Sequence, residues 1–141
     1  MNSSFVHLHC HTEFSLLEGA IKIKDLIQTV KTQEMPGVAL TDNGCMYGAI
    51  DFYVRMKEEG LNPIMGVEVF VVGNRFEKDR DFTRLILLAK SQTGYRNLIK
   101  LVSAGHLEGF YYRPRVDDEC LKQYADGLIA ISPLSRGLVA E

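Results

Sequence analysis

Three histidines alternate with other residues near the amino terminus, in the run His7-Leu8-His9-Cys10-His11. Successive side chains of a strand point to opposite faces, so His7, His9 and His11 would share one face. Neighbouring imidazoles supply the nitrogen ligands that Zn, Mn or Fe accept. A single histidine is more often a hydrogen-bonded structural residue. Three of the chain's four histidines within one short run favour a metal site instead.

A hydrolytic metal site also needs oxygen ligands and an open position for water. The carboxylate candidates are Glu18, Asp42 and Glu68. Glu68 interrupts the apolar run from Ile64 to Phe70, where a carboxylate is costly unless it is paired or bound to metal. The alternative is that Glu68 simply occupies the outward face of its strand. Asp42 before Asn-Gly is typical of a turn or cap, and Glu18 is typical of an exposed loop.

The elements that must position these residues are predicted to alternate along the chain. Hydrophobic periodicity predicts strands over 5–11, 38–41, 64–72, 85–89 and 128–131, helices over 23–34, 46–59, 94–106 and 117–124, and the start of a further helix in 134–141. Helices between strands imply crossovers and a largely parallel sheet in an α/β fold. Functional residues of such folds gather at the carboxyl ends of strands, here His9–Thr12, Asp42–Asn43, Glu68 and Ser132.

Composition and charge narrow the class of protein. The chain has 141 residues, which predicts one domain or part of one. Lys and Arg total 16 and Asp and Glu total 18, so bulk positive charge cannot drive nucleic-acid binding. The three cysteines form no CxxC pair, and we expect reduced thiols. The chain shows no secretory leader and no long apolar run, so a cytoplasmic location without membrane contact is expected.

The segment from Phe5 to Ala20 resembles the PHP domain that opens bacterial replicative DNA polymerase III α subunits, a domain named also for histidinol phosphatases. The resemblance continues in order through residues 39–44, 63–70, 87–90, 94–101, 107–111 and 127–132. It implies a distorted β/α barrel of about seven strands. Residues 1–141 would form a single PHP-like segment, roughly the first half of that barrel, truncated on its carboxyl-terminal side. The alternative is a short stand-alone relative.

In metal-competent members of this family the domain holds up to three metals and hydrolyses phosphodiesters, including as a 3′–5′ exonuclease. The resemblance implies His9, His11, Glu18 and Glu68 as metal ligands, with Glu18 where Asp is usual and His7 as a companion. The remaining Asp and His ligands of the family would lie beyond residue 141.

Three positions depart from the family pattern: Asn43 and Arg84 each stand where a ligand histidine is usual, and Leu134 stands where a cysteine is expected. Asparagine is a poor ligand for transition metals, leucine is none, and arginine brings positive charge to a cation site. The departures therefore predict a degraded site that binds Zn, Mn or Mg weakly and below stoichiometric amounts. Cys45 could offer a substitute thiolate.

The resemblance implies a mainly structural role. The segment would support the remainder of a polymerase chain, meet DNA through that chain and dock a separate proofreading exonuclease subunit. One alternative is an active metal-dependent phosphoesterase or 3′–5′ exonuclease that uses His9, His11 and Glu68. Another is a histidinol-phosphatase-like enzyme, against which the replicative-type segment Phe110–Arg115 argues. That segment suits phosphate or single-strand contact, or is an aromatic-anchored loop. A half-barrel exposes a strand edge, so self-association is expected.

Overall fold

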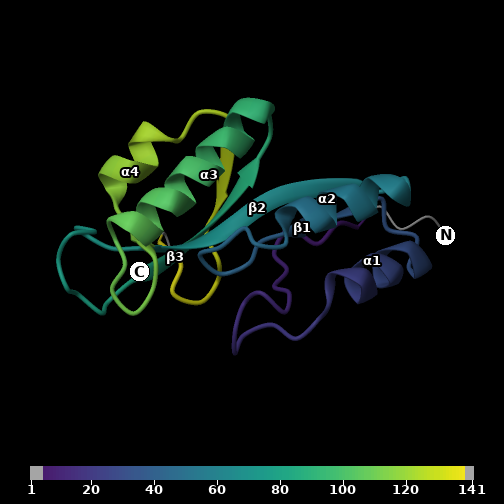
Figure 1. Cartoon of the computed structure of the whole chain (residues 1–141), viewed down its shortest axis with the longest axis horizontal. Helices are drawn as coiled ribbons and strands as arrows, with labels where there is room; N and C mark the ends of the chain where they lie inside the picture. Colours follow the sequence, from purple (N-terminus) through teal and green to yellow (C-terminus); the bar gives the residue numbers. More distant parts are fainter. Residues whose placement is uncertain (1–4, 139–141) are drawn as a thin grey trace.

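The computed structural model describes residues 5–138 as an α/β unit. Its elements in chain order are α1 (Ile23–Thr32), β1 (Gly37–Leu40), α2 (Ala49–Glu58), β2 (Asn62–Val71), β3 (Thr83–Ala89), α3 (Gln92–Leu107), β4 (Arg115–Val116), α4 (Asp118–Gln123) and β5 (Leu128–Ile131). Figure 1 shows the strands crossing the molecule behind the helices. The four main predicted helices and the predicted strands over 38–41, 64–72, 85–89 and 128–131 are confirmed, with ends that differ by a few residues, while β4 was not predicted.

The sheet has the strand order β1-β2-β3-β5, with the short β4 paired to β2. Strand β2 runs parallel to β1 and β4, but β3 is antiparallel to both β2 and β5. The expected largely parallel sheet is therefore wrong at β3. Parallel neighbours need a crossover of a dozen or more residues, whereas residues 72–82 join β2 to β3 as a loop without a helix.

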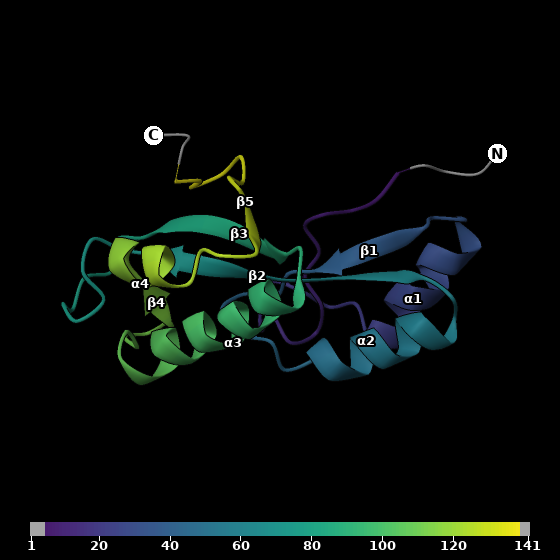
Figure 2. The same ribbon diagram turned by 90° about the horizontal axis from the view of Figure 1, so that it is seen from above.

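Helices cover one face of this sheet, as Figure 2 shows for α1, α2 and α3. Along β2 the side chains of Val67, Val69 and Val71 enter the core beneath α3, where they meet Leu98 and Leu101. Because side chains alternate along a strand, the residues between these valines face away from the helices. The alternation therefore places Glu68 on the face opposite the helices.

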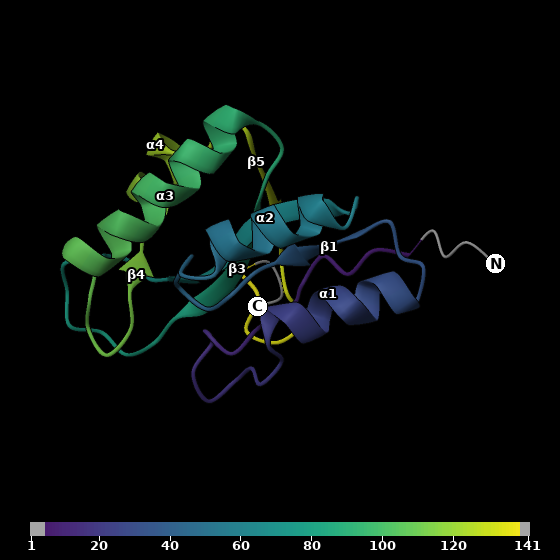
Figure 3. The same ribbon diagram turned by 45° about the vertical axis from the view of Figure 1, so that its right-hand side comes forward.

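Helix α1 forms at the predicted place because apolar residues recur at helical spacing. Ile23, Leu26, Ile27 and Val30 are all buried, and they share a core with Val38 of β1. Figure 3 shows α1 and α2 beside β1, with α3 and α4 toward the other end of the sheet. None of the helices within residues 5–138 is long and apolar enough to cross a membrane.

Helix α2 presents a different face to the core from the one its sequence suggested. In the sequence Ile50, Tyr53 and Val54 recur at helical spacing and predict an apolar face, yet all three are exposed. Phe52 and Met56 are fully buried instead. Both sets recur at helical spacing, so periodicity alone could not distinguish the buried face from the exposed one.

The two ends of the described chain also differ from prediction. Residues 5–11 do not form a regular strand, although they run alongside β1 with a bridge between His7 and Val38. The amide of Cys10 donates to the Thr41 hydroxyl at 2.8 Å, so a side chain takes the place of a ladder partner. At the other end, residues 134–138 do not start a helix; they bend, and Gly137 forms a bridge with Arg84 of β3. Residues 139–141 lie outside the described part.

A candidate metal centre

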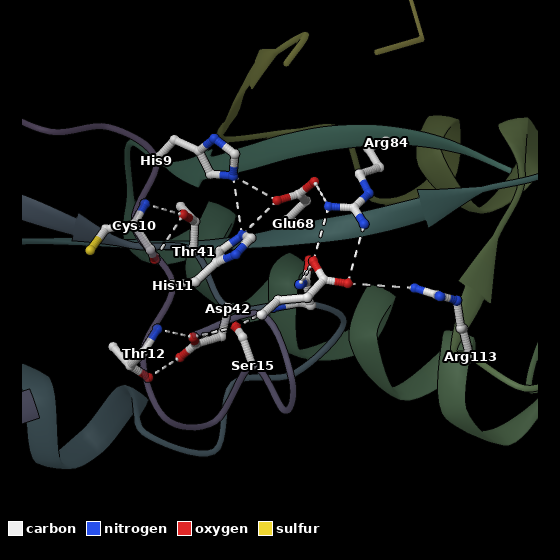
Figure 4. A network of polar contacts seen from close by, with 12 residues as sticks. His9, Cys10, His11, Thr12, Ser15, Thr41, Asp42, Glu68, Arg84 and Arg113 are labelled. Atoms are coloured by element: carbon white, nitrogen blue, oxygen red, sulfur yellow. Dashed lines mark hydrogen bonds and ion pairs between the residues drawn. The ribbon is translucent and has the colours of Figure 1, made fainter. Parts of the chain in front are cut away.

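Two imidazoles and one carboxylate converge on a single point. Nε2 of His9 and Nε2 of His11 each lie 2.6 Å from Oε2 of Glu68, and the two nitrogens are 3.1 Å apart. Among residues 5–138 this is the one group of three or more His, Cys, Asp or Glu side chains that could hold a metal ion. Figure 4 shows the two rings pointing at the carboxylate from one side. The predicted association of His9, His11 and Glu68 is thus a feature of the structure.

Glu68 is an ionised carboxylate inside the protein. Its side chain is fully buried, which by itself would raise its pKa. Hydrogen bonds from His11 and His9 outweigh burial and lower the pKa of Glu68 to about 2. An ionised carboxylate only accepts hydrogen bonds, so each histidine donates its Nε2 proton to the same oxygen. Glu68 therefore lies on the strand face that points away from the helices, but it is fully buried and paired there, as expected of a carboxylate inside an apolar strand.

The backbone brings the loop after β1 against the middle of β2. The amide of Glu68 donates to the Asp42 carbonyl at 3.1 Å, and the amide of Gly44 donates to the Glu68 carbonyl at 2.7 Å. Gly44 adopts φ 61°, a left-handed conformation that glycine adopts without steric cost. These contacts place Asn43 beside Glu68, although the two residues are far apart in the sequence.

Asp42 has a structural role, but it joins distant segments and does not cap the adjacent turn as its sequence suggested. Its side chain is buried and accepts hydrogen bonds from the Thr12 amide at 2.6 Å, the Thr12 hydroxyl at 2.7 Å and the Ser15 hydroxyl at 2.6 Å. The Ser15 hydroxyl also accepts from the Asn43 amide at 3.0 Å. Asp42 thereby ties the segment that follows His11 to the end of β1. Thr12 was included in the run His9–Thr12 at a predicted strand end and Ser15 was not considered, but the sequence carries no signal for the contact of either residue with Asp42.

We expect Asp42→Ala to lower the free energy of unfolding by about 3 kcal/mol, because three buried donors lose a charged acceptor at once. Urea unfolding followed by circular dichroism measures the change. Asp51→Ala is the matched control, since Asp51 is exposed and pairs with Arg55 one helical turn away, a contact that contributes about 0.5 kcal/mol or less. Equal losses in the two variants would contradict the structural role of Asp42.

Glu18 joins the centre through Arg84, not through the histidines. One guanidinium nitrogen of Arg84 donates to Glu18 at 3.1 Å and to the free Glu68 oxygen at 3.3 Å, and the other donates to Glu18 at 3.3 Å. The Asn43 side-chain amide donates to Glu18 at 2.7 Å. Burial opposes ionisation of Glu18, but the Arg84 and Asn43 hydrogen bonds outweigh it and lower its pKa.

The register of the sheet explains why Arg84 reaches both carboxylates. Arg84 of β3 lies opposite Phe70, so it is the diagonal neighbour of Glu68 on the same face. Two polar atoms at this place, Oδ1 of Asn43 and Nε of Arg84, are buried without a hydrogen-bond partner among the described residues. Each such atom costs about 1–3 kcal/mol. The centre is therefore polar, but two of its buried atoms make no hydrogen bond with the described residues.

Other residues considered from the sequence lie outside the three-residue group. His7 packs edge-on against the Phe5 ring at 4.8 Å. Cys45 is buried, and its thiol points at the Phe14 carbonyl at 3.7 Å. Burial raises the pKa of Cys45, which disfavours a thiolate ligand. The Leu134 side chain is almost entirely exposed.

The donor atoms fit one divalent ion. Two histidine nitrogens and one carboxylate oxygen are ligands that Zn and Mn accept, and all three lie within 4.8 Å of one another. The remaining oxygen of Glu68 and both oxygens of Glu18 face Arg84. Further ions would have to displace that guanidinium, so the arrangement favours one ion over a cluster.

Comparisons with known proteins identify the family of this chain. A family model described as the PHP domain matches residues 7–141. DNA polymerase III α subunits of Borreliella burgdorferi and Helicobacter pylori are 47% and 48% identical over 97% and 98% of this chain. The α subunit of Thermus aquaticus is 47% identical over 91% of it. The chain spans about 11–12% of these relatives, at their amino-terminal end.

Two solved structures share the fold at lower identity. One is a protein of Bifidobacterium adolescentis proposed to be a metal-dependent phosphoesterase, with a TM-score of 0.54 and 19% identity over 74% of this chain and 34% of that one. The other is an amidohydrolase of Chromobacterium violaceum with bound sulfate, with a TM-score of 0.52 and 21% identity over 71% of this chain and 32% of that one. Fold and sequence therefore agree, and the chain belongs to the PHP domain family.

Proposed function

We propose that this chain is the amino-terminal PHP segment of a DNA polymerase III α subunit in which the former metal centre has become a structural one. The observation that carries the proposal is the guanidinium of Arg84, which bridges Glu18 and Glu68. A permanent positive charge there offsets part of the negative charge of the two carboxylates, which divalent cations would otherwise bind. The centre then links β2, β3 and the two loops that follow His11 and β1.

In this proposal His9, His11 and Glu68 retain the ability to hold at most one ion. A bound divalent ion would supply a Lewis acid and an activated water. The residues that would support further ions are engaged elsewhere: Glu18 accepts from Arg84 and Asn43. The polar contacts of Glu18, Glu68 and Arg84 would thus hold β2 and β3 to the loops that follow His11 and β1.

The metal content of the purified chain tests this proposal. After dialysis against a weak chelator, we expect less than one Zn or Mn per chain by plasma mass spectrometry. His9→Gln should abolish the residual binding, while His7→Gln, which lies outside the three-residue group, should leave it unchanged. Recovery of two or three tightly held ions would overturn the proposal, and it would favour the metal-dependent phosphoesterase or 3′–5′ exonuclease. The His9, His11 and Glu68 group is the observation that supports that second candidate.

The proposal extends to partners through the relatives' identity as polymerase subunits. The segment would support the remainder of the polymerase chain, meet DNA through it and dock a separate proofreading exonuclease subunit. Because β5 forms the edge of the described sheet and Ile129 on it is half exposed, the isolated segment would also self-associate. The histidinol-phosphatase-like alternative has less support, since the relatives named above are replication proteins.

A further inference from the structure

The loop that joins β2 to β3 carries a group of arginine contacts that the proposed function does not use. Figure 2 shows this loop beyond the end of β2, beside α4. The loop borders a cavity of about 650 Å³, whose lining also includes Val71 at the end of β2 and Thr83 at the start of β3. We propose that residues 73–81 form a strap that opens and closes as one unit beside this cavity, and that Arg75 and Arg115 latch it closed.

The strap has little structure of its own. All of its residues except Arg75 are exposed, and none of them belongs to the apolar cores of the described chain. The Glu77 amide donates to the Asn74 carbonyl at 3.2 Å and closes one turn within the strap. A Cβ atom on Gly73 would meet nothing within 4 Å, so the strap leaves β2 into open space. Exposed segments with few buried apolar contacts open locally at low cost, so polar side chains must keep the strap closed.

Arg75 binds the strap to the start of α4. Its guanidinium donates to the Asp117 carboxylate at 2.8 and 3.0 Å and to Glu108 at 2.8 Å, and its backbone amide donates to Asp117 at 3.1 Å. Burial alone would raise the pKa of Asp117, but hydrogen bonds from the Arg75 and Cys120 amides and from the Arg75 guanidinium outweigh burial and lower it. Arg75 and Asp117 therefore form an ionised, largely buried pair, which is stronger than an exposed one.

Arg115 of β4 is a buried cation whose hydrogen-bond acceptors are backbone carbonyls. The residue is 3% exposed, and it forms no ion pair with any residue that the structure describes. Its guanidinium donates to the carbonyls of Gly109 at 2.8 Å, Asp79 at 2.8 Å and Arg75 at 3.0 Å. A buried charge is costly unless it is hydrogen-bonded. Because Asp79 and Arg75 belong to the strap, opening would remove two of these three acceptors, and closure restores them.

A third arginine couples the strap to a neighbouring loop. Arg80 donates to the Tyr112 hydroxyl at 2.7 Å, and its guanidinium lies 4.4 Å from the centroid of that ring. Tyr112 belongs to the loop that the Arg115 amide closes by donating to the Gly109 carbonyl at 3.3 Å. The strap is thus held near its start through Arg75 and near its end through Arg80. We therefore expect it to open as a unit and not to fray residue by residue.

Opening of the strap would bare the side of the cavity that Asp79, Arg80 and Asp81 line. The pairing of β2 with β3 would persist, because its register includes no strap residue. Access to the cavity would then depend on the latch and not on unfolding of the sheet. The strap does not involve His9, His11 or Glu68, so its behaviour is independent of metal binding at that centre.

Limited digestion of the whole purified chain with trypsin tests the proposal, and mass spectrometry of the intact products identifies each cleaved bond. Cleavage after Lys78 and Arg80 follows the population of the open strap. We expect Arg75→Gln and Arg115→Gln to speed cleavage at these two sites about tenfold or more, because each removes hydrogen bonds from a charged donor. Asp117→Asn keeps the size of the side chain and should act in the same direction with a smaller effect. This milder variant decides the test if an arginine variant fails to fold.

Arg55→Gln is the matched control, since Arg55 is exposed on α2 and pairs with Asp51 one helical turn away. It should leave strap cleavage unchanged. Cleavage after Lys57 in α2 and Lys100 in α3 reports global unfolding in the same digest, and both sites should stay intact while the strap is cut. Strap cleavage in the unmodified chain as fast as in the denatured chain would overturn the proposal. Equal rates in all variants, or parallel cleavage of the two helices, would also overturn it.

Discussion

Glu68→Ala should lower the free energy of unfolding by about 3–5 kcal/mol, because it removes one partner of a buried charged contact. Glu68 is fully buried and accepts hydrogen bonds from His9, His11 and Arg84. Without the Glu68 carboxylate, the imidazoles of His9 and His11 face a cavity. The Arg84 guanidinium keeps only the carboxylate of Glu18 as a partner. Urea unfolding followed by circular dichroism at neutral pH measures the loss. Glu59→Gln, in an exposed pair with Lys31, should cost at most about 1 kcal/mol.

The ionisation of Glu68 makes the free energy of unfolding depend on pH. The pKa of Glu68 is lowered from its ordinary value of 4.5 to about 2 by hydrogen bonds that outweigh burial. A lowered pKa in the folded state contributes stability that is fully present above about 4.5 and is lost as the pH falls through about 2. The shift corresponds to about 3 kcal/mol at neutral pH.

A comparison of the unmodified chain with Glu68→Gln isolates this contribution. The glutamine variant keeps the shape of the side chain but has no carboxylate to protonate. The difference in stability between the two chains should therefore be largest at neutral pH and should shrink as the pH approaches about 2. A difference that stays constant over that range would contradict an ionised, buried Glu68.

The double substitution Asn43→His and Arg84→His should raise the affinity for Zn²⁺ by at least about hundredfold. It removes the guanidinium that bridges Glu18 and Glu68, and it adds two imidazoles at the same place. Changes to residues that merely support metal ligands alter affinity by about 10–100-fold, so a change of the ligands themselves should exceed that range. The two substitutions act on the same ion, so their effects should be strongly non-additive.

Calorimetric titration with Zn²⁺ and Mn²⁺ compares the double variant with each single one. Arg113→His is the control, because it adds an imidazole nearby without releasing Glu68 from Arg84. Adding Leu134→Cys to the double variant tests the third departure from the family pattern; its side chain is exposed, and we expect a smaller further gain. Unchanged affinity in the double variant would show that Asn43 and Arg84 are not what weakens the site.

The candidate ligands could be predicted from the sequence because their signals are local. The alternation of His9 and His11 places both on one face of any extended segment, whatever the rest of the chain does. Glu68 is conspicuous because a carboxylate inside an apolar strand needs a partner. The four apolar residues of α1 recur at helical spacing and are buried as that pattern requires. Each of these inferences depends on neighbours within a few residues.

The sheet direction and the buried face of α2 could not be predicted in the same way. Tyr53 and Phe52 both belong to apolar sets at helical spacing, and only packing against β1 and β2 decides which set is buried. Strand β3 is antiparallel to β2 because the loop of residues 72–82 between them contains no helix. The prediction of a largely parallel sheet did not take this short connection into account. Both errors arise because local periodicity does not specify which strand pairs with which or which helix face packs against the sheet.

The role of Arg84 is the clearest example of a contact that only the tertiary structure determines. In the sequence Arg84 is a departure from a family pattern, distant from both Glu18 and Glu68. The antiparallel register of β2 and β3 makes it the diagonal neighbour of Glu68, and the loop after His11 brings Glu18 to the same guanidinium. Sequence alone therefore predicted His9, His11 and Glu68 as a group, which the structure brings together. Strand pairing decided which charges meet, because electrostatic contacts depend on distance in space and not on separation along the chain.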